Sequence, residues 1–300
     1  MGIIQKRRPA LRPFEWLLAA YGKKLYRLAR RLPYGKYTDR MVFYAQFLAR
    51  QKRLPRRGGS FVDFVFYLKR DDKLSNDLQA LTTDKELVKD FLASTIGAEH
   101  VAPTFAVLRS ETDIDAYAFP DQCYIKGTAS SGLLIAHDGG ALDRQALKGW
   151  LSENQYAQMR EQHYRRLVPK IIVEPYYFGT KLAREFRVFC HRGSVRFIVC
   201  TSAYLEPPGA RAFDRNWTDL GIAMSRPLFP AIPRPVLLDR MIDAAETIGT
   251  HFDFVRADMY TDENAFLVGE LTHCPGSANS FFVPPEGERT IDALMFADGA

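Results

Sequence analysis

The stretch FVRADMYTDENAFLVGELTHCPGS, residues 254–277, contains two apolar runs that alternate as β-strands do, separated by the turn-forming cluster TDEN. This pattern predicts a β-hairpin with its turn centred near Glu263 and Asn264. In that register Asp258 pairs approximately with Glu270. Because side chains alternate between the two faces of a strand, one face of the hairpin is then expected to carry Arg256, Asp258, Tyr260, Val268, Glu270 and Thr272.

Two carboxylates that face each other across a hairpin are destabilising, since cross-strand Cβ atoms are only about 5 Å apart. A shared divalent cation with oxygen ligands would compensate for the charges of Asp258 and Glu270, and so would a bridging arginine or a shared proton. A register shifted by one residue would instead leave one carboxylate solvated. The hairpin alone leaves these alternatives open.

Composition places the chain among soluble globular proteins. It has 300 residues, of which 47% are hydrophobic and 25% charged, enough for about two domains. The cysteines, Cys123, Cys190, Cys200 and Cys274, show no metal-ligand spacing, so we expect reduced thiols. The longest apolar runs are too short to span a bilayer or to form a signal peptide, so a cytoplasmic location is expected.

Basic residues are concentrated at the N-terminus. Residues 1–70 contain 18 Lys or Arg and three acids, a balance of +15, whereas the remainder contains 23 basic and 32 acidic residues, a balance of −9. The basic clusters are Lys6–Arg8, Arg27–Leu32 and Arg50–Arg57. They predict either a solvated helical face or contact with an anionic partner or membrane surface at the inner face of the membrane. No nucleic-acid-binding motif accompanies them, so nucleic acid is not the expected partner.

The pattern of apolar residues predicts a mixture of helices and antiparallel strands. Helices are expected within 10–52, at 83–97 with Thr83 or Asp84 as N-cap and Gly97 as stop, within 143–167 and at 236–249. Strands are expected at 104–108, 123–126, 133–137 and 170–178, with a strand–turn–strand unit at 185–200. Residues 60–80 are expected to form a connecting segment. This order indicates an α+β fold rather than a doubly wound parallel sheet.

A second segment suggests phosphate chemistry. In YIKGTASSGLLIA, residues 124–136, Lys126 ends a strand and a loop of small residues leads into the next strand. The backbone amides of such a loop can approach phosphate oxygens, and the lysine adds a point charge. A hairpin turn with a solvent-facing lysine is the alternative. The segment is no Walker A loop, because GxxxxGK[ST] is absent and no helix follows.

Other polar residues give weaker signals. The histidines His163, His191, His251 and His273 have no paired metal-ligand spacing, and no Gly-x-Ser-x-Gly elbow occurs. Zinc-enzyme and hydrolase functions therefore find little support, and Trp217 is interpreted as a packing residue.

Seven motifs, taken together in chain order, resemble those of ATP-grasp enzymes, most closely the TupA-like branch associated with teichuronopeptide and capsular polysaccharide biosynthesis. They are Asp84–Lys85, IKGTASSG (125–132), VEPYY (173–177), EFRVF (185–189), DRNWTDL (214–220), VRADMY (255–260) and GELTHCPGS (269–277). The resemblance covers roughly residues 60–290. It implies an ATP-grasp fold, in which two α+β lobes clamp ATP, preceded here by a basic helical region.

The resemblance also implies a role for individual residues. Lys85 and Lys126 match the two lysines that hold ATP phosphates. The flexible loop over the phosphates is matched by Gly127, Thr128, Ser130, Ser131 and Gly132. The hinge that meets adenine is matched by Glu174, Pro175, Tyr176 and Tyr177, and Glu185 matches a position that often binds ribose.

Asp258 and Glu270 match the magnesium ligands, which would explain why they face each other. Many ATP-grasp enzymes have Asn two residues after the glutamate, whereas Thr272 stands here, a weaker ligand that leaves a second metal site in doubt. Arg256 and Arg187 are the candidates for holding the γ-phosphate or an incoming carboxylate. An amide-rich turn for a substrate oxyanion is assigned to Pro275, Gly276 and Ser277.

The function implied by the resemblance is an ATP- and Mg²⁺-dependent carboxylate–amine ligase that forms an amide through an acyl phosphate. Its substrates would be a sugar acid or amino acid and an amine donor. A glycan or sugar kinase using the same site is one alternative, and a membrane-surface binding protein with a vestigial nucleotide site is another. The expected division of the chain is a basic helical region at 1–58, an N-terminal lobe at 59–172 and a C-terminal lobe at 173–300.

Overall fold

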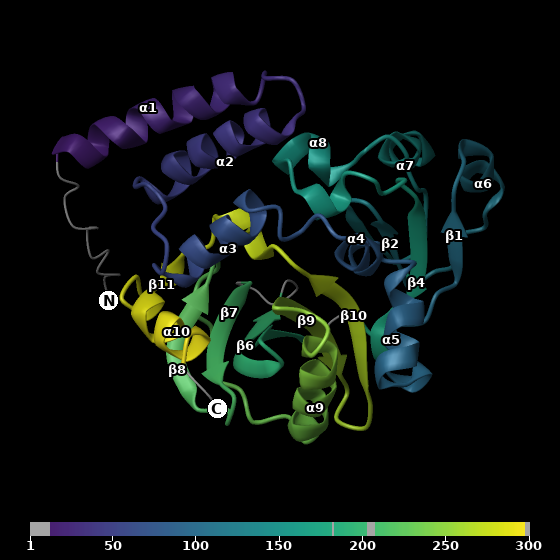
Figure 1. Cartoon of the computed structure of the whole chain (residues 1–300). Coiled ribbons are helices and arrows are strands. Elements are labelled where there is room, and N and C mark those ends of the chain that lie inside the picture. The colour runs from purple at the N-terminus through teal and green to yellow at the C-terminus, as the bar shows by residue number, and fades with distance from the viewer. Residues whose placement is uncertain (1–12, 182, 203–207, 298–300) are drawn as a thin grey trace, which may run out of the picture.

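A computed structural model describes residues 13–181, 183–202 and 208–297 (Figure 1). The basic cluster at Lys6–Arg8 lies outside the described residues. The helices are α1 (Pro13–Ala29), α2 (Lys36–Gln51), α3 (Phe61–Arg70), α4 (Asp77–Thr83), α5 (Val88–Ile96), α6 (Glu111–Ala116), α7 (Arg144–Trp150), α8 (Gln155–Met159), α9 (Leu238–Gly249) and α10 (Gly287–Met295). Short 3₁₀ turns are η1 (Ala98–His100), η2 (Gln162–Tyr164), η3 (Tyr177–Gly179) and η4 (Pro275–Ala278).

The strands form two antiparallel sheets. Strands β1 (Ala106–Leu108), β4 (Ile171–Pro175), β2 (Cys123–Gly127) and β3 (Leu134–His137) form, in that order, a sheet of four. A sheet of seven has the order β10 (Phe266–Thr272), β9 (Phe254–Thr261), β5 (Glu185–His191), β6 (Ser194–Ser202), β7 (Gly209–Asp214), β8 (Asp219–Met224) and β11 (Phe282–Val283). The α+β prediction is confirmed.

Helices cover both faces of the larger sheet. One face packs against α9 and α5 in a core that includes Val188, Ile198 and Val255. The opposite face packs against α3 and α10 in a second core that includes Phe189, Phe197 and Phe254. Figure 1 shows α1 and α2 outside α3, so the N-terminal helices extend this second layer away from the sheet.

Residues 60–80 contain α3 and α4, so the prediction of a connecting segment there is wrong. Ser60 and Asp63 form a capping box at the start of α3. Phe61 is fully buried and makes edge contacts with Phe189 and Phe197. The aromatic run that interrupts the basic N-terminus is therefore part of the main core.

The helix expected from Thr83 or Asp84 begins later. The Asp84 carboxylate accepts hydrogen bonds from the backbone N–H groups of Glu86 (2.9 Å) and Leu87 (3.3 Å), which caps a turn before α5. Gly97 ends α5 with φ of 98°, as expected of a glycine stop.

The hairpin of β9 and β10 has the expected pairing, with Asp258 opposite Glu270. A β-bulge at Gly269 shifts the register between Val268 and Glu270, so that Val268 pairs with Met259 and is buried in the core under α9. The placement of Val268 beside the carboxylates is therefore wrong. The sequence pattern did not reveal the extra residue that a bulge inserts.

Replacing Gly269 with Ala is expected to destabilise the protein by about 1–3 kcal/mol through overpacking. An added Cβ would lie 2.9 Å from a ring carbon of Tyr260 and 3.3 Å from the hydroxyl of Tyr177. Both rings are packed in one aromatic cluster and cannot move away freely. Urea unfolding measures the effect, and Gly149→Ala is the control, because an added Cβ at this exposed position of α7 would meet no atom within 4 Å and the backbone is not left-handed. Equal losses in the two variants would contradict the packing argument.

The division of the chain at 58 and 172 stays a prediction. Strand β4, Ile171–Pro175, belongs to the sheet of four and crosses the expected boundary between the lobes. The N-terminal helices are firmly attached: Arg160 donates to the carboxylate of Asp39 at 2.7 Å, and both side chains are buried. Among the helices that the structure describes, none is long and apolar enough to cross a membrane.

Candidate functional site

Carboxylates and arginines meet on the face of β5, β9 and β10 that points away from α9. Arg187 pairs with Asp258 across β5 and β9, and Asp258 pairs with Glu270 across β9 and β10. Arg256 donates to both oxygens of Asp258, at 2.6 Å and 2.5 Å. A guanidinium therefore supplies the positive charge that the two facing carboxylates require, which is one of the alternatives that the sequence left open.

Burial shapes the electrostatics of this group. Asp258 is only 3% exposed, and burial raises its pKa to about 6, with Arg256 opposing and the charge of Glu185 adding to the rise. The pKa of Arg256 is raised by Asp258, Glu185 and Glu270 against the effect of burial. Three carboxylates thus act on the Arg256 guanidinium, and Arg187 and Lys85 are the other cations beside them.

Glu270 is the more open of the two facing carboxylates. Its side chain is 31% exposed, Lys85 Nζ lies 3.8 Å from its Oε2, and the Thr272 hydroxyl donates to its Oε1 at 3.4 Å. Oxygen donors at Asp258, Glu270 and Thr272 suit Mg²⁺, which proteins hold with one or two carboxylates while water and phosphate complete the shell. In the described part of the chain, no group of three or more His, Cys, Asp or Glu side chains is placed to hold a metal ion. Asp258, Glu270 and Thr272 thus offer two carboxylates and one hydroxyl to a cation, and water and phosphate would have to supply its other ligands.

Glu185 lies beside this group rather than apart from it. Its carboxylate accepts from Arg187 Nε at 2.8 Å and from the Thr201 hydroxyl at 2.5 Å, and the Tyr260 hydroxyl donates to it at 3.4 Å. Burial opposes ionisation, but Arg187 and Arg256 hold the pKa of Glu185 below its usual value. Both candidate catalytic arginines are thus engaged with carboxylates of the same face.

A largely buried cluster contains Lys126 and Glu174 of the smaller sheet and Lys89 of α5. Lys126 Nζ donates to Glu174 at 2.6 Å and to the Tyr177 hydroxyl at 2.8 Å, while Lys89 Nζ donates to the other oxygen of Glu174 at 2.5 Å. Burial lowers the pKa of Lys126, but Glu174 and the more distant Glu270 outweigh it and raise the value. Burial also opposes ionisation of Glu174, yet the two lysines keep its pKa lowered.

The sequence did not predict that Lys89 belongs to this cluster. Its pKa is lowered because burial outweighs its ion pair with Glu174. It follows Lys85 by four residues, the spacing of neighbours on one helical face, and this was the available signal. Lys85 lies beside the loop of small residues, because its Nζ donates to the backbone carbonyl of Ser130 at 2.9 Å.

The loop of small residues connects β2 to β3 next to these lysines. Thr128 and Ser130 are buried, Ser131 is exposed, and Gly132 has φ of 94°, a left-handed conformation that favours glycine. Gly127 closes the loop with a hydrogen bond from its N–H to the carbonyl of Leu133, at 3.1 Å. The loop therefore lies between Lys85 and Lys126.

The residues expected at the hinge are the last two of β4 and the two tyrosines that follow, which lie in an aromatic cluster. Tyr176 and Tyr177 are buried with Tyr124 and Ala102, and Leu267 and Tyr260 pack against them. Pro175 is the last residue of β4. The cluster joins the small sheet to the end of the large one, so the expected hinge lies where the two sheets meet.

The turn at Pro275, Gly276 and Ser277 lies on the other side of the facing carboxylates. Gly276 (φ 59°) and Ser277 (φ 53°) both adopt left-handed conformations. The Ser277 hydroxyl accepts a hydrogen bond of 2.7 Å from the fully buried Lys69 of α3. This lysine gave no recognisable signal in the sequence, because it lies in a basic pair that looks like a solvated helix end.

A cavity of about 240 Å³ is lined by some of these groups. Its lining includes Ser131 of the loop, Arg256, Glu270, Thr272, Gly276 and Ser277, and also Glu161, His163 and Tyr164, for which the sequence predicted no role in the site.

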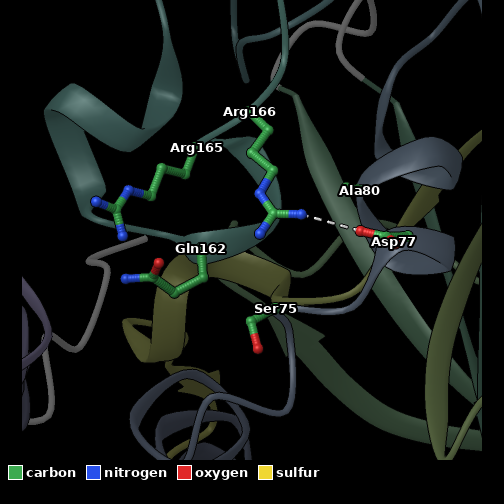
Figure 2. A pocket seen from close by; sticks show the side chains of 6 residues that line it. All are labelled: Ser75, Asp77, Ala80, Gln162, Arg165 and Arg166. Atoms are coloured by element: carbon green, nitrogen blue, oxygen red, sulfur yellow. Dashed lines mark hydrogen bonds and ion pairs between the residues drawn. The ribbon is translucent and has the colours of Figure 1, made fainter.

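A larger cavity of about 490 Å³ lies on the outer side of η2, lined by Ser75, Asp77, Ala80, Gln162, Arg165 and Arg166 (Figure 2). Figure 2 shows Arg166 directed at Asp77, with which it forms an exposed ion pair of 3.1 Å. No predicted site residue lines this larger cavity.

The solved structures that are similar to this chain are distant in sequence. Among solved structures, the D-alanine–D-alanine ligase from Helicobacter pylori is 17% identical, with 66% of this chain and 56% of that chain covered and a TM-score of 0.41. The L-amino acid ligase from Bacillus licheniformis is 12% identical, with 71% and 49% covered and a TM-score of 0.44. This chain thus spans about half the length of these two structures.

No curated protein matches the sequence. The family described as TupA-like ATPgrasp matches residues 65–295, which is most of the chain and contains every motif of the predicted site. The protein therefore belongs to the TupA-like ATP-grasp family and has an ATP-grasp fold.

Proposed function

We propose that the protein is an ATP- and Mg²⁺-dependent carboxylate–amine ligase whose substrate is a sugar acid or amino acid of cell-surface polysaccharide biosynthesis. The observation that best supports this function is the position of Asp258 and Glu270. These carboxylates face each other at the edge of the large sheet, beside Lys85 and the loop of small residues. Such an arrangement suits phosphoryl transfer, which depends on positioning and charge neutralisation more than on covalent help from the protein.

Each group has a proposed task. Lys85, Lys126 and the loop hold the ATP phosphates, and Asp258 and Glu270 hold the cation, which supplies charge neutralisation for the transferring phosphoryl group. When Asp258 coordinates a cation, it no longer needs Arg256 as its counter-charge. The guanidinium can then bind the γ-phosphate or the substrate carboxylate bidentately.

The direct experiment measures acyl-phosphate formation with hydroxylamine, which attacks such an intermediate to give a hydroxamate. Wild-type protein with ATP and Mg²⁺ is offered D-glucuronate or each of the twenty amino acids. Hydroxamate formed in step with ADP is the expected result. ADP formed with a phosphorylated sugar and no hydroxamate would contradict a ligase.

We also propose that the outer face of the helical hairpin formed by α1 and α2 contacts an anionic membrane surface. Tyr21, Leu25 and Leu28 repeat at helical spacing on α1 and are 65%, 49% and 52% exposed. Exposed basic residues, Lys23, Lys24, Arg27, Arg30 and Arg31, accompany this apolar stripe. A helix with exposed apolar and basic side chains suits the interface of an anionic bilayer.

Changing Lys23, Lys24, Arg27 and Arg31 to Ala is expected to weaken binding to vesicles of phosphatidylserine and phosphatidylcholine by about 10²–10³-fold, since each basic residue near such a surface contributes about 1 kcal/mol. Cosedimentation measures the binding, and a variant with Ala at the exposed Arg192, Arg234, Arg240 and Arg289 is the matched control. Substitution is preferable to deletion of residues 1–58, because α2 provides the buried partner of Arg160. Equal weakening in both variants would contradict a docking role for α1.

A further inference from the structure

The cavity of about 240 Å³ extends beyond the proposed phosphate and metal groups into a buried polar region. Glu161 and His163 line this end and are 4% and 2% exposed. They belong to the segment between α8 and β4, which gave no functional signal in the sequence. Polar groups are seldom buried in this way without a partner or a ligand.

His163 has an unused hydrogen-bonding atom. Its Nε2 lies 3.6 Å from Glu161 Oε2, whereas its buried Nδ1 has no hydrogen-bond partner within the described ranges 13–181, 183–202 and 208–297. Burial, together with the charges of His273 and Lys69, lowers the pKa of His163 well below its usual value. The ring is therefore neutral near pH 7, and one nitrogen can accept a proton or a hydrogen bond.

Several donors of the lining are already in use. The Thr83 hydroxyl donates to the carbonyl of Gln79 at 2.7 Å, the Thr272 hydroxyl donates to Glu270, and Arg256 donates to Asp258. With Glu270 assigned to the cation, the acceptors that remain for a ligand include His163 Nδ1 and the lone pairs of Glu161 that Ser277 and Cys274 leave free. Such a set favours a ligand rich in N–H donors over one that carries acceptors.

The charge of Lys69 acts on Glu161, although Lys69 is not among the residues that line the cavity. Its Nζ donates to Gln46 at 3.0 Å and to Ser277 at 2.7 Å, so it does not occupy the cavity itself. Burial raises the pKa of Glu161, and the charge of Lys69 and hydrogen bonds from Ser277 and Cys274 oppose that rise. The Glu161 carboxyl group is therefore held by Ser277 and Cys274, which follow β10, while Lys69 of α3 adds a favourable charge.

We propose that this end of the cavity binds the amine substrate of the ligase, as a small primary amino group held by Glu161 and His163, with His163 accepting the proton that makes the amine nucleophilic. The proposal rests on the ligase function proposed above and names its second substrate class. The volume is below the roughly 300–1,000 Å³ of sites for drug-sized ligands, so only a small molecule or the end of a larger one enters.

The amine loses two protons as the amide bond forms. The ammonium group gives one proton to His163 in the same step in which the electron pair that is freed attacks the acyl carbon, so that a C–N bond forms and the C–O bond to phosphate breaks. The nitrogen loses its second proton to the departing phosphate. Both electrons of the broken bond leave with the phosphate oxygen, and no oxidant or reductant is needed.

Binding is tested by NMR of protein with ¹⁵N-labelled histidine, titrated with glycinamide and with glycolamide, which has a hydroxyl group in place of the amine. The signals of His163 are assigned by their absence in His163→Gln. We expect a saturable shift with glycinamide, little with glycolamide, and at least tenfold weaker glycinamide binding in Glu161→Gln. A stronger response to glycolamide would overturn the proposal in favour of a hydroxyl acceptor, and no shift of His163 with either probe would overturn it outright.

Catalysis is tested by comparing glycinamide with hydroxylamine, which is uncharged near pH 7 and needs no base. His163→Gln is expected to form amide about 10²-fold more slowly at pH 7 while forming hydroxamate within threefold of wild type. The amide rate should recover at pH 9, above the pKa of about 8 of such an amine. His191→Gln, at a buried histidine bonded to the Met295 carbonyl, controls for stability.

Different results would contradict the ligase function and the amine site at Glu161 and His163. Wild-type protein that forms no hydroxamate would contradict the ligase function, whereas the NMR titration does not depend on turnover. Hydroxamate formed by wild type, with amide and hydroxamate lost equally in His163→Gln, would reject the amine site alone.

Discussion

Replacing Glu270 with Gln is expected to lower ATP-dependent ADP formation by about 10³-fold, a loss of roughly 4 kcal/mol of transition-state stabilisation. The substitution removes one of the two facing carboxylates that are proposed to hold Mg²⁺. Glu270 is 31% exposed and its nearest cation, Lys85, is 3.8 Å away, so the fold should lose little stability. Coupled-enzyme detection of ADP gives the rate, and thermal unfolding confirms the fold.

Asp258→Asn should cause a similar loss of activity but a larger loss of stability, because Arg256 is buried against that carboxylate. Glu263→Gln, in the exposed turn of the same hairpin, is the matched control and should keep wild-type activity. If Glu270→Gln retained more than a tenth of the wild-type rate, the metal assignment would be wrong.

Replacing Glu174 with Ala is expected to destabilise the protein by about 3–5 kcal/mol, because two buried lysines lose their shared counter-charge. Lys126 and Lys89 both donate to this carboxylate, which is 1% exposed. The control is Asp77→Ala, which removes the partner of Arg166 in the exposed ion pair of Figure 2 and should cost at most about 1 kcal/mol. Urea unfolding at pH 7 measures both.

The pH dependence of this effect has a definite sign. The folded-state pKa of Glu174 is lowered, so its ionised form stabilises the protein above the unfolded pKa of about 4.3. That contribution is lost as the pH falls through the lower folded-state value. The difference between wild type and Glu174→Gln should therefore be largest near pH 7 and shrink below about pH 4. A difference that stays constant down to pH 3 would show that Glu174 does not act through its charge.

Local patterns were sufficient to predict much of the fold. Alternation in β9 and β10 predicted the hairpin and the pairing of Asp258 with Glu270, and Gly97 marked the end of α5. The bulge at Gly269 was missed because it depends on the packing of Tyr177 and Tyr260 around a position without a side chain. The helix α3 was missed because its apolar residues were judged without the sheet against which they pack.

The predicted site residues lie on the facing surfaces of two sheets, but the sequence could not indicate their partners. Arg256 was expected to bind phosphate, and its bidentate contact with Asp258 two residues away along the same strand face was not foreseen. Glu161, His163 and Lys69 come from segments with no recognisable motif and meet only because the α3 layer packs over the end of the large sheet. Such long-range contacts depend on tertiary packing and leave no local signal.

In the proposed function, the facing carboxylates Asp258 and Glu270 and the lysines Lys85 and Lys126 support ATP-driven amide formation from an acid and an amine. The most direct measurement is ATP turnover with Mg²⁺ in the presence of pooled amino acids and uronic acids, with acid and amine omitted in turn. We expect the wild-type protein to release ADP and free phosphate only when an acid and an amine are both present. We expect Asp258→Asn and Glu270→Gln to release neither product. Phosphate retained on a sugar product, or no binding of ATP by the wild-type protein with Mg²⁺, would contradict the proposed function.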